Sequence, residues 1–390
     1  MKKVKVLHTI TRLVVGGAQE NTIITSHLLD NKKYDIELIR GPQTGVEGSL
    51  LKRARKWNLK IFTFPYLVRE ISLIKDLFHL FKMIIFLEKK NYTIVHTHSS
   101  KAGVIHRLAA KIARVPIIIH TVHGWSFHTE LPHLLRKFYI FWERIAAMCT
   151  DKIITVSACD VDKGLKEHIA VRKKYITIHS SIDIDKYAKP TKNILRIKQN
   201  LGLDKEKVIV GTVSRMVPQK APLDFISVAH KICKKYDNVQ FLFVGDGELK
   251  KEVEKFIANY NLENNVILAG LRKDIPDMLA VMDIFVLTSL WEGLPRVFPQ
   301  AMAAKLPVIA TKLNGSKEII KDNWNGYMTE SGKPDQIVAK LEILINNKAK
   351  RERLGLNGFN KINPKFCVYK MTQNIDLLYQ KLLKKHGQLC

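Results

Sequence analysis

A pair of cations in the second half of the chain has the spacing of a phosphate-binding loop. The segment Ser214–Lys220 (SRMVPQK) follows an apolar, β-branched run and contains Arg215 and Lys220, five positions apart. Arginine supplies a planar fork of donors and lysine a compact charge, so the two together suit a diphosphate. The chain contains 64 lysines and arginines, and a pair with this spacing is therefore expected in some loop by chance.

A carboxylate follows another apolar run, in the segment Trp291–Pro295 (WEGLP), and Gln300 lies in the helix expected after it. A Glu-Gly turn before a helix places Glu292 beside backbone N–H groups that have no partner within the helix. Retaining glycosidases use two carboxylates about 5 Å apart, and the sequence indicates no such pair. The turn therefore offers a ligand one carboxylate and several N–H donors.

The first half contains twelve of the 14 histidines, all before Pro190. His98 and His123 each follow an apolar run, and Gly16-Gly17 follows the first such run. An imidazole at these positions can hydrogen-bond a sugar hydroxyl or a leaving phosphate, and two glycines allow a ligand to approach backbone N–H groups. The alternative is structural: histidines that cap strand ends, and an ordinary turn. The spacing fits neither an HExxH-type zinc site nor a GxGxxG dinucleotide motif.

Short apolar runs alternate with amphipathic segments, which predicts parallel sheets covered by helices on both faces. The strands predicted in the first half are Val4–Ile10, Asp35–Arg40, Ile61–Phe64, Thr93–Thr97, Ile117–Thr121 and Ile153–Ser157, with helices at Gln19–Leu29, Lys101–Ala113 and Leu134–Met148. After a polar linker the pattern restarts, with strands at Val208–Val213, Gln240–Val244, Val266–Ala269, Ile284–Leu287 and Val308–Ala310 and helices at Leu223–Tyr236, Glu248–Tyr260, Asp335–Ile345 and Lys370–Lys385. We therefore expect two Rossmann-like α/β domains facing across a cleft, with ligands bound beyond the carboxyl ends of the strands.

The amino-acid composition limits the classes of protein to which this chain can belong. The chain has 390 residues, 46% hydrophobic and 26% charged, which suits two globular domains and excludes disorder. The net charge of +28 favours anionic partners such as membranes, nucleic acids or phosphorylated metabolites, although a lysine-rich genome would give the same balance. No pattern of a nucleic-acid-binding motif accompanies the charge. Five scattered cysteines without CxxC spacing predict a reducing compartment and no disulfide framework.

The most apolar stretch, Ile71–Leu87, has 12 apolar residues of 17 but includes Lys75, Asp76 and Lys82. It is shorter than the roughly 20 residues that a membrane span needs. We therefore predict a buried or interfacial helix. The N-terminus lacks a continuous apolar segment and a small-residue cleavage site, so we predict no signal peptide.

Taken together, these segments resemble the family-4 glycosyltransferases, retaining enzymes of the GT-B fold. The resemblance extends over nearly the whole chain, and it depends on the order and intervals of the motifs. The motifs are Gly16–Gln19 (GGAQ), Val95–Gly103 (VHTHSSKAG), Thr121–Trp125 (TVHGW), Ser214–Lys220, Phe243–Lys250 (FVGDGELK), Glu292–Thr311 (EGLPRVFPQAMAAKLPVIAT) and Asn314–Ile320 (NGSKEII).

The resemblance implies roles for individual residues. Arg215 and Lys220 would bind the nucleotide diphosphate and stabilise it as it leaves, Glu292 would contact the donor sugar, and His123 would lie beside the reacting centre. The implied donor-binding residues are Gly16, Gly17, Arg215, Lys220, Gly245, Leu271, Arg272, Glu292, Gly293, Leu294 and Gln300, and the implied acceptor-binding residues are His98, His123 and Trp125.

Several residues depart from the family pattern. Gln300 replaces the glutamate that normally binds the ribose hydroxyls, and Pro299 precedes it. Ala221 and Lys305 stand where glycine is common, and His179–Asp183 replaces the usual Pro-Asn-Gly-Ile-Asp. None of these changes removes the cation pair, but together they are compatible with a diverged or impaired active site.

The resemblance implies an acceptor-binding domain over residues 1–188, a nucleotide-sugar-binding domain over 189–365, and a basic helix over 366–390 that crosses back to the first domain. It implies a retaining hexosyltransferase that moves a sugar from a nucleotide sugar, expected to be a UDP-sugar, to a lipid-linked or glycan acceptor in cell-surface polysaccharide synthesis. Attack would occur on the front face of the sugar, without a metal or other cofactor. We expect a cytoplasmic protein at the inner face of an anionic membrane, with no nucleic-acid partner. The alternatives are a catalytically silent binding subunit and a nucleotide-sugar isomerase of related fold.

Overall fold

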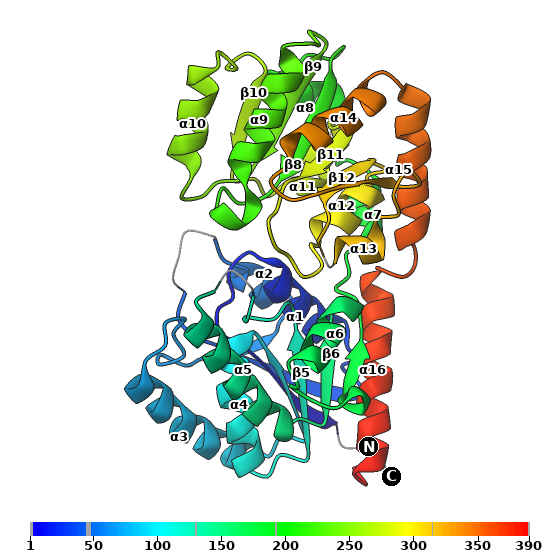
Figure 1. Ribbon diagram of the computed structural model, residues 1–390. Coiled ribbons are helices and arrows are strands. Elements are labelled where there is room, and N and C mark those ends of the chain that lie inside the picture. The colour runs from blue at the N-terminus through cyan, green and yellow to red at the C-terminus, as the bar shows by residue number, and fades with distance from the viewer. Residues whose placement is uncertain (1–2, 44–47, 129–130, 192, 314, 389–390) are drawn as a thin grey trace. The chain divides into compact units, whose positions relative to one another are not determined.

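The computed structural model describes residues 3–43, 48–128, 131–191, 193–313 and 315–388, which form two compact units (Figure 1). The first unit comprises residues 1–180 and 368–390, and the second comprises residues 181–367. Each unit is a parallel sheet with helices packed on it, as the alternating sequence pattern predicts.

Seven parallel strands form the sheet of the first unit, in the order β3-β2-β1-β4-β5-β6-β7. Their bounds are β1 Val4–Ile10, β2 Tyr34–Arg40, β3 Lys60–Thr63, β4 Ile94–His98, β5 Ile117–Val122, β6 Lys152–Thr155 and β7 Tyr175–Thr177. The strand order reverses between β1 and β4, which are hydrogen-bonded neighbours. The connections that leave these two strands diverge, and a parallel sheet opens a crevice at such a point.

Helices cover both faces of this sheet. They are α1 Gly17–Leu28, α2 Leu51–Lys56, α3 Leu73–Lys90, α4 Ser100–Ile112, α5 His133–Met148 and α6 Ala158–Lys166, with a short 3-10 helix at Arg172–Lys174. Successive strand residues point to opposite faces. Val6 and Ile94 therefore pack with α1, while Leu7 and Val95 pack with α3 and α4.

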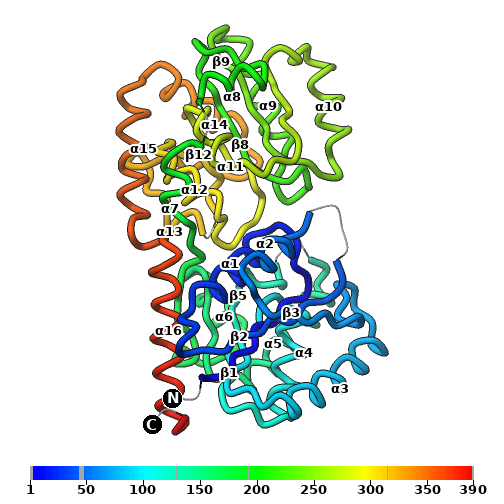
Figure 2. The backbone as a smooth tube through the Cα atoms, turned by 180° about the vertical axis from the view of Figure 1, so that it is seen from behind, coloured from blue at the N-terminus to red at the C-terminus, as the bar shows by residue number. Residues whose placement is uncertain are grey.

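The last helix, α16 (Val368–Lys385), belongs to the first unit although it follows the whole of the second unit in the sequence. Figure 2 shows it running beside α1, the helix with which it is in contact. Met371, Ile375, Leu378 and Leu382 are buried at the spacing of one helical face, against the same strand residues as α1. This confirms the prediction that the C-terminal helix crosses back to the first domain.

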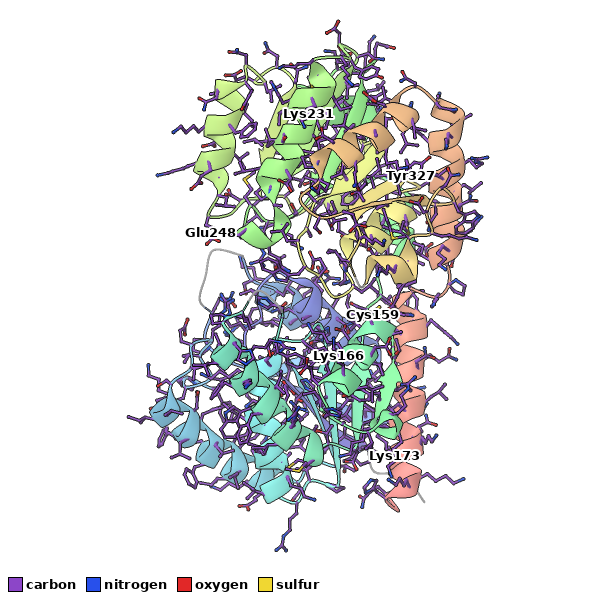
Figure 3. All side chains as sticks on the ribbon, in the orientation of Figure 1. Cys159, Lys166, Lys173, Lys231, Glu248 and Tyr327 are labelled. Carbon is purple, nitrogen blue, oxygen red and sulfur yellow. The ribbon has the colours of Figure 1, made fainter. Side chains whose placement is uncertain are left out.

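The second unit has six parallel strands in the order β10-β9-β8-β11-β12-β13. They are β8 Val208–Val213, β9 Val239–Val244, β10 Val266–Gly270, β11 Ile284–Leu287, β12 Val308–Thr311 and β13 Gly326–Thr329. The helices are α7 Ile184–Ala188, α8 Ile194–Leu201, α9 Pro222–Cys233, α10 Lys250–Asn259, α11 Ile275–Ala280, α12 Val297–Ala303, α13 Ser316–Ile319, α14 Pro334–Ile345 and α15 Lys348–Ile362. The core lies between the sheet and these helices and includes Tyr327 of β13, labelled in Figure 3.

The two units divide after Ser180 and after Cys367, whereas the sequence suggested divisions after residues 188 and 365. The difference arises because α7, over Ile184–Ala188, packs against α11 and α12 of the second unit. Ile182, two residues before α7, also donates its backbone N–H to the carbonyl of Phe366 at 2.9 Å.

We expect α16 to be necessary for the stability of the first unit. Replacing the buried Leu378 by alanine removes core contacts and leaves a cavity, which should lower the free energy of unfolding by about 2–5 kcal/mol. Leu377→Ala on the same helix is the matched control, because Leu377 is 56% exposed and should change stability by less than about 0.5 kcal/mol. Urea unfolding measures both, and equal effects of the two variants would contradict the packing described for α16.

Candidate active site

In the second unit, hydrogen bonds join the loops that follow the neighbouring strands β8 and β11. Leu290 donates its N–H to the carbonyl of Gln219 at 2.8 Å, and the Gln219 side chain donates to the carbonyl of Trp291 at 2.8 Å. Thr288 Oγ1 donates to the carbonyl of Lys220 at 2.9 Å. The sheet brings these loops together because β8 and β11 are adjacent parallel strands that end at the same edge.

Lys220 and Glu292 form an ion pair between these loops. Glu292 Oε1 also accepts a hydrogen bond from Ser289 Oγ at 3.1 Å, so its carboxylate is held on two sides. Both side chains are largely covered, at 16% and 11% exposure. Arg215 follows β8 in the same connection and is exposed. The arrangement presents cations to an anion while a carboxylate fixes the position of one of them.

Two glycines allow neighbouring connections to approach these loops. At Gly245 (φ 145°), after β9, a Cβ atom would lie 1.8 Å from the carbonyl oxygen of Ser214. At Gly315, a Cβ atom would lie 1.7 Å from the carbonyl oxygen of Gly293. Only glycine fits such contacts, so four connections of the second sheet converge on one edge. Asn314, which precedes Gly315 in the NGSKEII motif, lies outside the described residues.

The remaining residues predicted for the donor take different positions. Leu271 follows β10 and is exposed, and Arg272 forms a two-point ion pair with Asp274 at 2.9 and 2.7 Å. Leu294 is buried, so only its backbone can meet a ligand. Gln300 lies on α12, and its side-chain amide donates to the Tyr187 hydroxyl of α7 at 2.9 Å. Tyr187 was not expected at this site, because nothing in the sequence pattern links α7 to α12.

In the first unit, Gly16 and Gly17 form the start of α1, after β1. His98 ends β4, is buried, and has its Nδ1 atom 3.1 Å from Nε2 of His123. Trp125 packs instead in the core: its indole N–H donates to the carbonyl of Asp160 at 2.7 Å. The structure therefore joins His98 to His123, whereas the Trp125 side chain is largely buried, at 8% exposure.

The sequence did not reveal that His98 belongs to a larger buried group. His8 Nδ1 lies 3.0 Å from His98 Nε2, and His8 Nε2 lies 3.3 Å from the hydroxyl of Tyr379 on α16. Tyr379 also contacts His96 Nδ1 at 2.6 Å, and His96 Nε2 contacts Thr121 Oγ1 at 2.7 Å. The pairing of β1 with β4 could have predicted part of this group from the sequence, because it makes His8 and His96 register partners.

Three of these residues, His8, His96 and His98, are close enough to be considered as metal ligands, since one ring nitrogen of each lies within 4.8 Å of the other two. All six ring nitrogens, however, already contact another ring or a hydroxyl group. A metal ion would have to replace those hydrogen bonds, so the group fits a hydrogen-bonded array better than a metal site.

A cavity of about 570 Å³ opens in the first unit at the crevice between β1 and β4. The loops at its polar end are tied together by Thr11 and Ser99, whose hydroxyl oxygens lie 2.8 Å apart. Ser99 has φ 62°, which is an unusual value outside glycine and a known feature of ligand-binding sites. The polar end is lined by Thr11, Arg12, Gln19, Ser99, Ser100 and Lys101.

The rest of the cavity is apolar and lies between α3, α4 and α5. Its walls include Leu73, Leu77, Leu80, Val104, Ile105, Leu108, Phe138 and Trp142. Lys101 is held at 2.6 Å by Asp76, and Glu143 in the wall is paired at 2.6 Å with the buried Arg107. The cavity therefore combines a cationic end with an apolar body, a combination suited to a ligand with an anionic head and a hydrocarbon tail.

Burial keeps the histidines of the first unit neutral. It lowers the pKa of His8 to about 3 and lowers the pKa of His96, His98, His106 and His120 well below the usual 6.5. The unfolded chain takes up protons at these histidines below pH 6.5, whereas the native chain does not. Their contribution to stability is therefore complete above about pH 7 and is lost as the pH falls.

We predict that the first unit loses stability as the pH falls from 7 to 5, because the unfolded chain takes up protons at these histidines and the native chain does not. Between Ser181 and Cys367 the only histidine is His230, so the second unit is an internal control. Hydrogen exchange of β1 and β4 against β8 and β9, corrected for the intrinsic pH dependence, measures the difference. The same pH dependence in both units would contradict the prediction.

Comparison with known proteins gives the family. Residues 15–186 match the model of Glycosyltransferase Family 4, and residues 193–361 match that of Glycosyl transferases group 1. The chain is 34% identical to UDP-Gal:alpha-D-GlcNAc-diphosphoundecaprenol alpha-1,3-galactosyltransferase of Escherichia coli, over 97% of both chains. It is 27% identical to the capsular polysaccharide biosynthesis glycosyltransferase CapM of Staphylococcus aureus, over 99% of both.

Solved structures agree in fold. Anabaena Alr3699/HepE, crystallised with UDP and glucose, matches with a TM-score of 0.82 at 22% identity, over 97% of this chain and 99% of that one. Together with the two parallel-sheet units, these similarities confirm the fold class and the family predicted from the motifs. The chain belongs to glycosyltransferase family 4 and is a glycosyltransferase of the GT-B fold.

Proposed function

We propose that this glycosyltransferase moves a hexose, with retention of configuration, from a UDP-sugar to a glycan carried on a polyprenyl diphosphate, in the synthesis of a cell-surface polysaccharide. The observation that carries the proposal is the cavity of the first unit, with its cationic end at the strand termini and its apolar body. A polyprenyl diphosphate has the matching chemistry. The relative from Escherichia coli is named for such an acceptor and for UDP-galactose, so galactose is the sugar to test first.

The donor site is assigned to the strand-end loops of the second unit. Arg215 and Lys220 bind the diphosphate of the UDP-sugar, and Glu292 orients Lys220 and contacts the sugar. Backbone at Gly245, Gly293 and Leu294 lines the same edge, and Leu271 and Arg272 meet the base. Gln300 donates through its nitrogen to Tyr187, which leaves its amide oxygen to accept from a ribose hydroxyl.

The proposed reaction needs little covalent chemistry from the protein. The bond from the anomeric carbon to the β-phosphate oxygen breaks, and the acceptor hydroxyl bonds to that carbon on the same face. The hydroxyl proton passes to the leaving phosphate. Arg215 and Lys220 stabilise the charge that develops on the UDP, an electrostatic role that does not require a metal. We therefore expect transfer to continue in EDTA.

Attachment to the membrane is assigned to α3. No helix among the described residues is long and apolar enough to span a bilayer. Leu73 and Ile74 at the start of α3 are nonetheless 78% and 84% exposed, and Lys75 follows them. An exposed apolar edge flanked by lysines suits the surface of an anionic membrane, which attracts each nearby cation by about 1 kcal/mol. The same helix forms a wall of the cavity, so a lipid tail could reach the cavity directly from the inner face of the membrane.

The role of the two cations is testable by substitution. Arg215→Ala or Lys220→Ala should lower kcat about 30- to 1000-fold, which corresponds to about 2–4 kcal/mol of transition-state stabilisation. Lys235→Ala is the matched control, because Lys235 forms an exposed ion pair with Glu342 in the same unit. Initial rates of UDP release with acceptor present measure the effect, and unimpaired transfer by the Arg215/Lys220 double variant would refute the assignment.

The apolar cavity makes a separate prediction about the acceptor. Leu77→Asp places a charge in the cavity wall at a position that is 55% exposed, so folding should tolerate it. The loss of apolar contact should raise KM for an undecaprenyl-linked acceptor about 10-fold or more, while KM for the UDP-sugar stays constant. Leu356→Asp, at an exposed leucine of α15, is the control. If KM for a short-chain acceptor rises equally, the cavity does not hold the tail.

A further inference from the structure

A continuous chain of side chains runs from the C-terminal helix to His123. It begins at the hydroxyl of Tyr379 and passes through His8 (3.3 Å) and His98 (3.0 Å) to Nε2 of His123 (3.1 Å). A second branch runs from the same hydroxyl to His96, at 2.6 Å. Tyr379, His8 and His96 are fully buried, and His98 is 1% exposed.

The fold explains why these residues meet. His8 and His96 point to the face of the sheet that α16 covers, in alternation with the neighbouring Leu7 and Val95 on the other face. Tyr379 is one of the α16 residues buried against that face. The Tyr379 end of this hydrogen-bonded chain therefore exists because α16 returns to the first unit.

In a chain of buried, neutral imidazoles, the direction of one hydrogen bond determines the direction of the next. Burial lowers the pKa of His8, His96 and His98, so none of them carries a charge at neutral pH. A neutral imidazole donates from one nitrogen and accepts at the other. Once the direction of one hydrogen bond is set, the tautomer of every following ring is set too.

The distances select one of the two possible directions. The shorter contact, Tyr379 to His96 Nδ1 at 2.6 Å, fits a hydroxyl donating to nitrogen. The Tyr379 oxygen then accepts from His8 Nε2–H at the longer distance of 3.3 Å. His8 Nδ1 accepts from His98 Nε2–H, and His98 Nδ1 accepts from His123 Nε2–H. In this direction the proton of His123 is on Nε2, and its Nδ1 atom is an acceptor.

We propose that Tyr379 is a positioning residue whose hydroxyl, acting through His8 and His98, fixes the tautomer of His123. The consequence for sugar transfer rests on the proposed function together with the family resemblance, which implies that His123 lies beside the reacting centre. The tautomer itself does not depend on that assignment. Tyr379 thus gives the C-terminal helix a part in defining the active site, in addition to its part in the core.

Removal of the Tyr379 hydroxyl should reverse the direction of the hydrogen bonds from His8 to His123. In Tyr379→Phe, His8 Nε2–H would be a buried donor without a partner, which is less tolerable than a buried acceptor without one. The favoured direction is then the opposite one, in which His8 donates to His98 and His98 donates to His123 Nε2. The proton of His123 moves to Nδ1, so the atom that accepted a hydrogen bond now donates one.

The experiment compares Tyr379→Phe with Tyr34→Phe. The Tyr34 hydroxyl donates to Asp376 of α16 at 2.6 Å, and the Tyr34 ring packs edge-on against the Tyr379 ring, with centroids 5.8 Å apart. Tyr34→Phe keeps that ring contact and removes only the hydroxyl, so it controls for loosening of the helix. Long-range ¹H–¹⁵N spectra of histidine-labelled protein report the tautomer of each ring. We expect His123 as the Nε2–H form in wild type and in Tyr34→Phe, and as the Nδ1–H form in Tyr379→Phe.

Kinetics gives the second readout. Tyr379→Phe should lower kcat about 10-fold or more with KM for the UDP-sugar unchanged, while Tyr34→Phe retains the wild-type kcat. An unchanged His123 tautomer in Tyr379→Phe, or the same change in Tyr34→Phe, would overturn the proposal. Binding of one zinc ion to wild type but not to a His8→Gln variant would also overturn it, in favour of a metal site. If wild type transfers no sugar but the spectra change as expected, the proposed function fails and the proposal about Tyr379 stands.

Discussion

Both candidate ligand sites of this protein depend on one geometric constraint: neighbouring strands of a parallel sheet end at the same edge. In the second unit this edge joins the loops after β8 and β11, where Lys220 meets Glu292 across 72 residues of sequence. In the first unit it places the end of β1 beside the end of β4, where the cavity opens. The helices on the two faces stabilise the strands, and the loops beyond the strand ends are left for ligands.

Burial of polar groups is the second constraint, and it acts differently in the two units. The cations of the second unit lie in loops near solvent, where an arriving diphosphate can reach them. The histidines of the first unit lie inside the sheet-helix interface, where an unpaired polar atom is costly. They are tolerated because they are neutral and bond to one another, to Tyr379 and to Thr121. This arrangement lowers the stability of the first unit at low pH, and it gives the hydrogen bonds a defined direction.

The sequence was sufficient for features that depend on local pattern. Apolar runs predicted the strands that carry the site, and motif order predicted the fold and the family. The edge strands β7 and β13 were missed because their sequences, YIT and GYMT, lack the continuous apolar run that marks the equally short β11. Ala221 and Lys305, recognised as departures from common glycines, adopt φ values of 44° and 57°, which explains why glycine suits those positions. The contact of Tyr379 with His96 joins residues 283 positions apart. No local sequence pattern predicts it, because it depends on the packing of α16 against the first sheet.

The most direct test of the account is the transfer reaction itself. Purified protein would be incubated with UDP-galactose and a sugar-diphosphate-undecaprenol, and the lipid product analysed by NMR at the new anomeric carbon. The account predicts one hexose added to the lipid-linked sugar, in the α configuration of the donor. Release of free galactose without transfer, or a β linkage in the product, would contradict it.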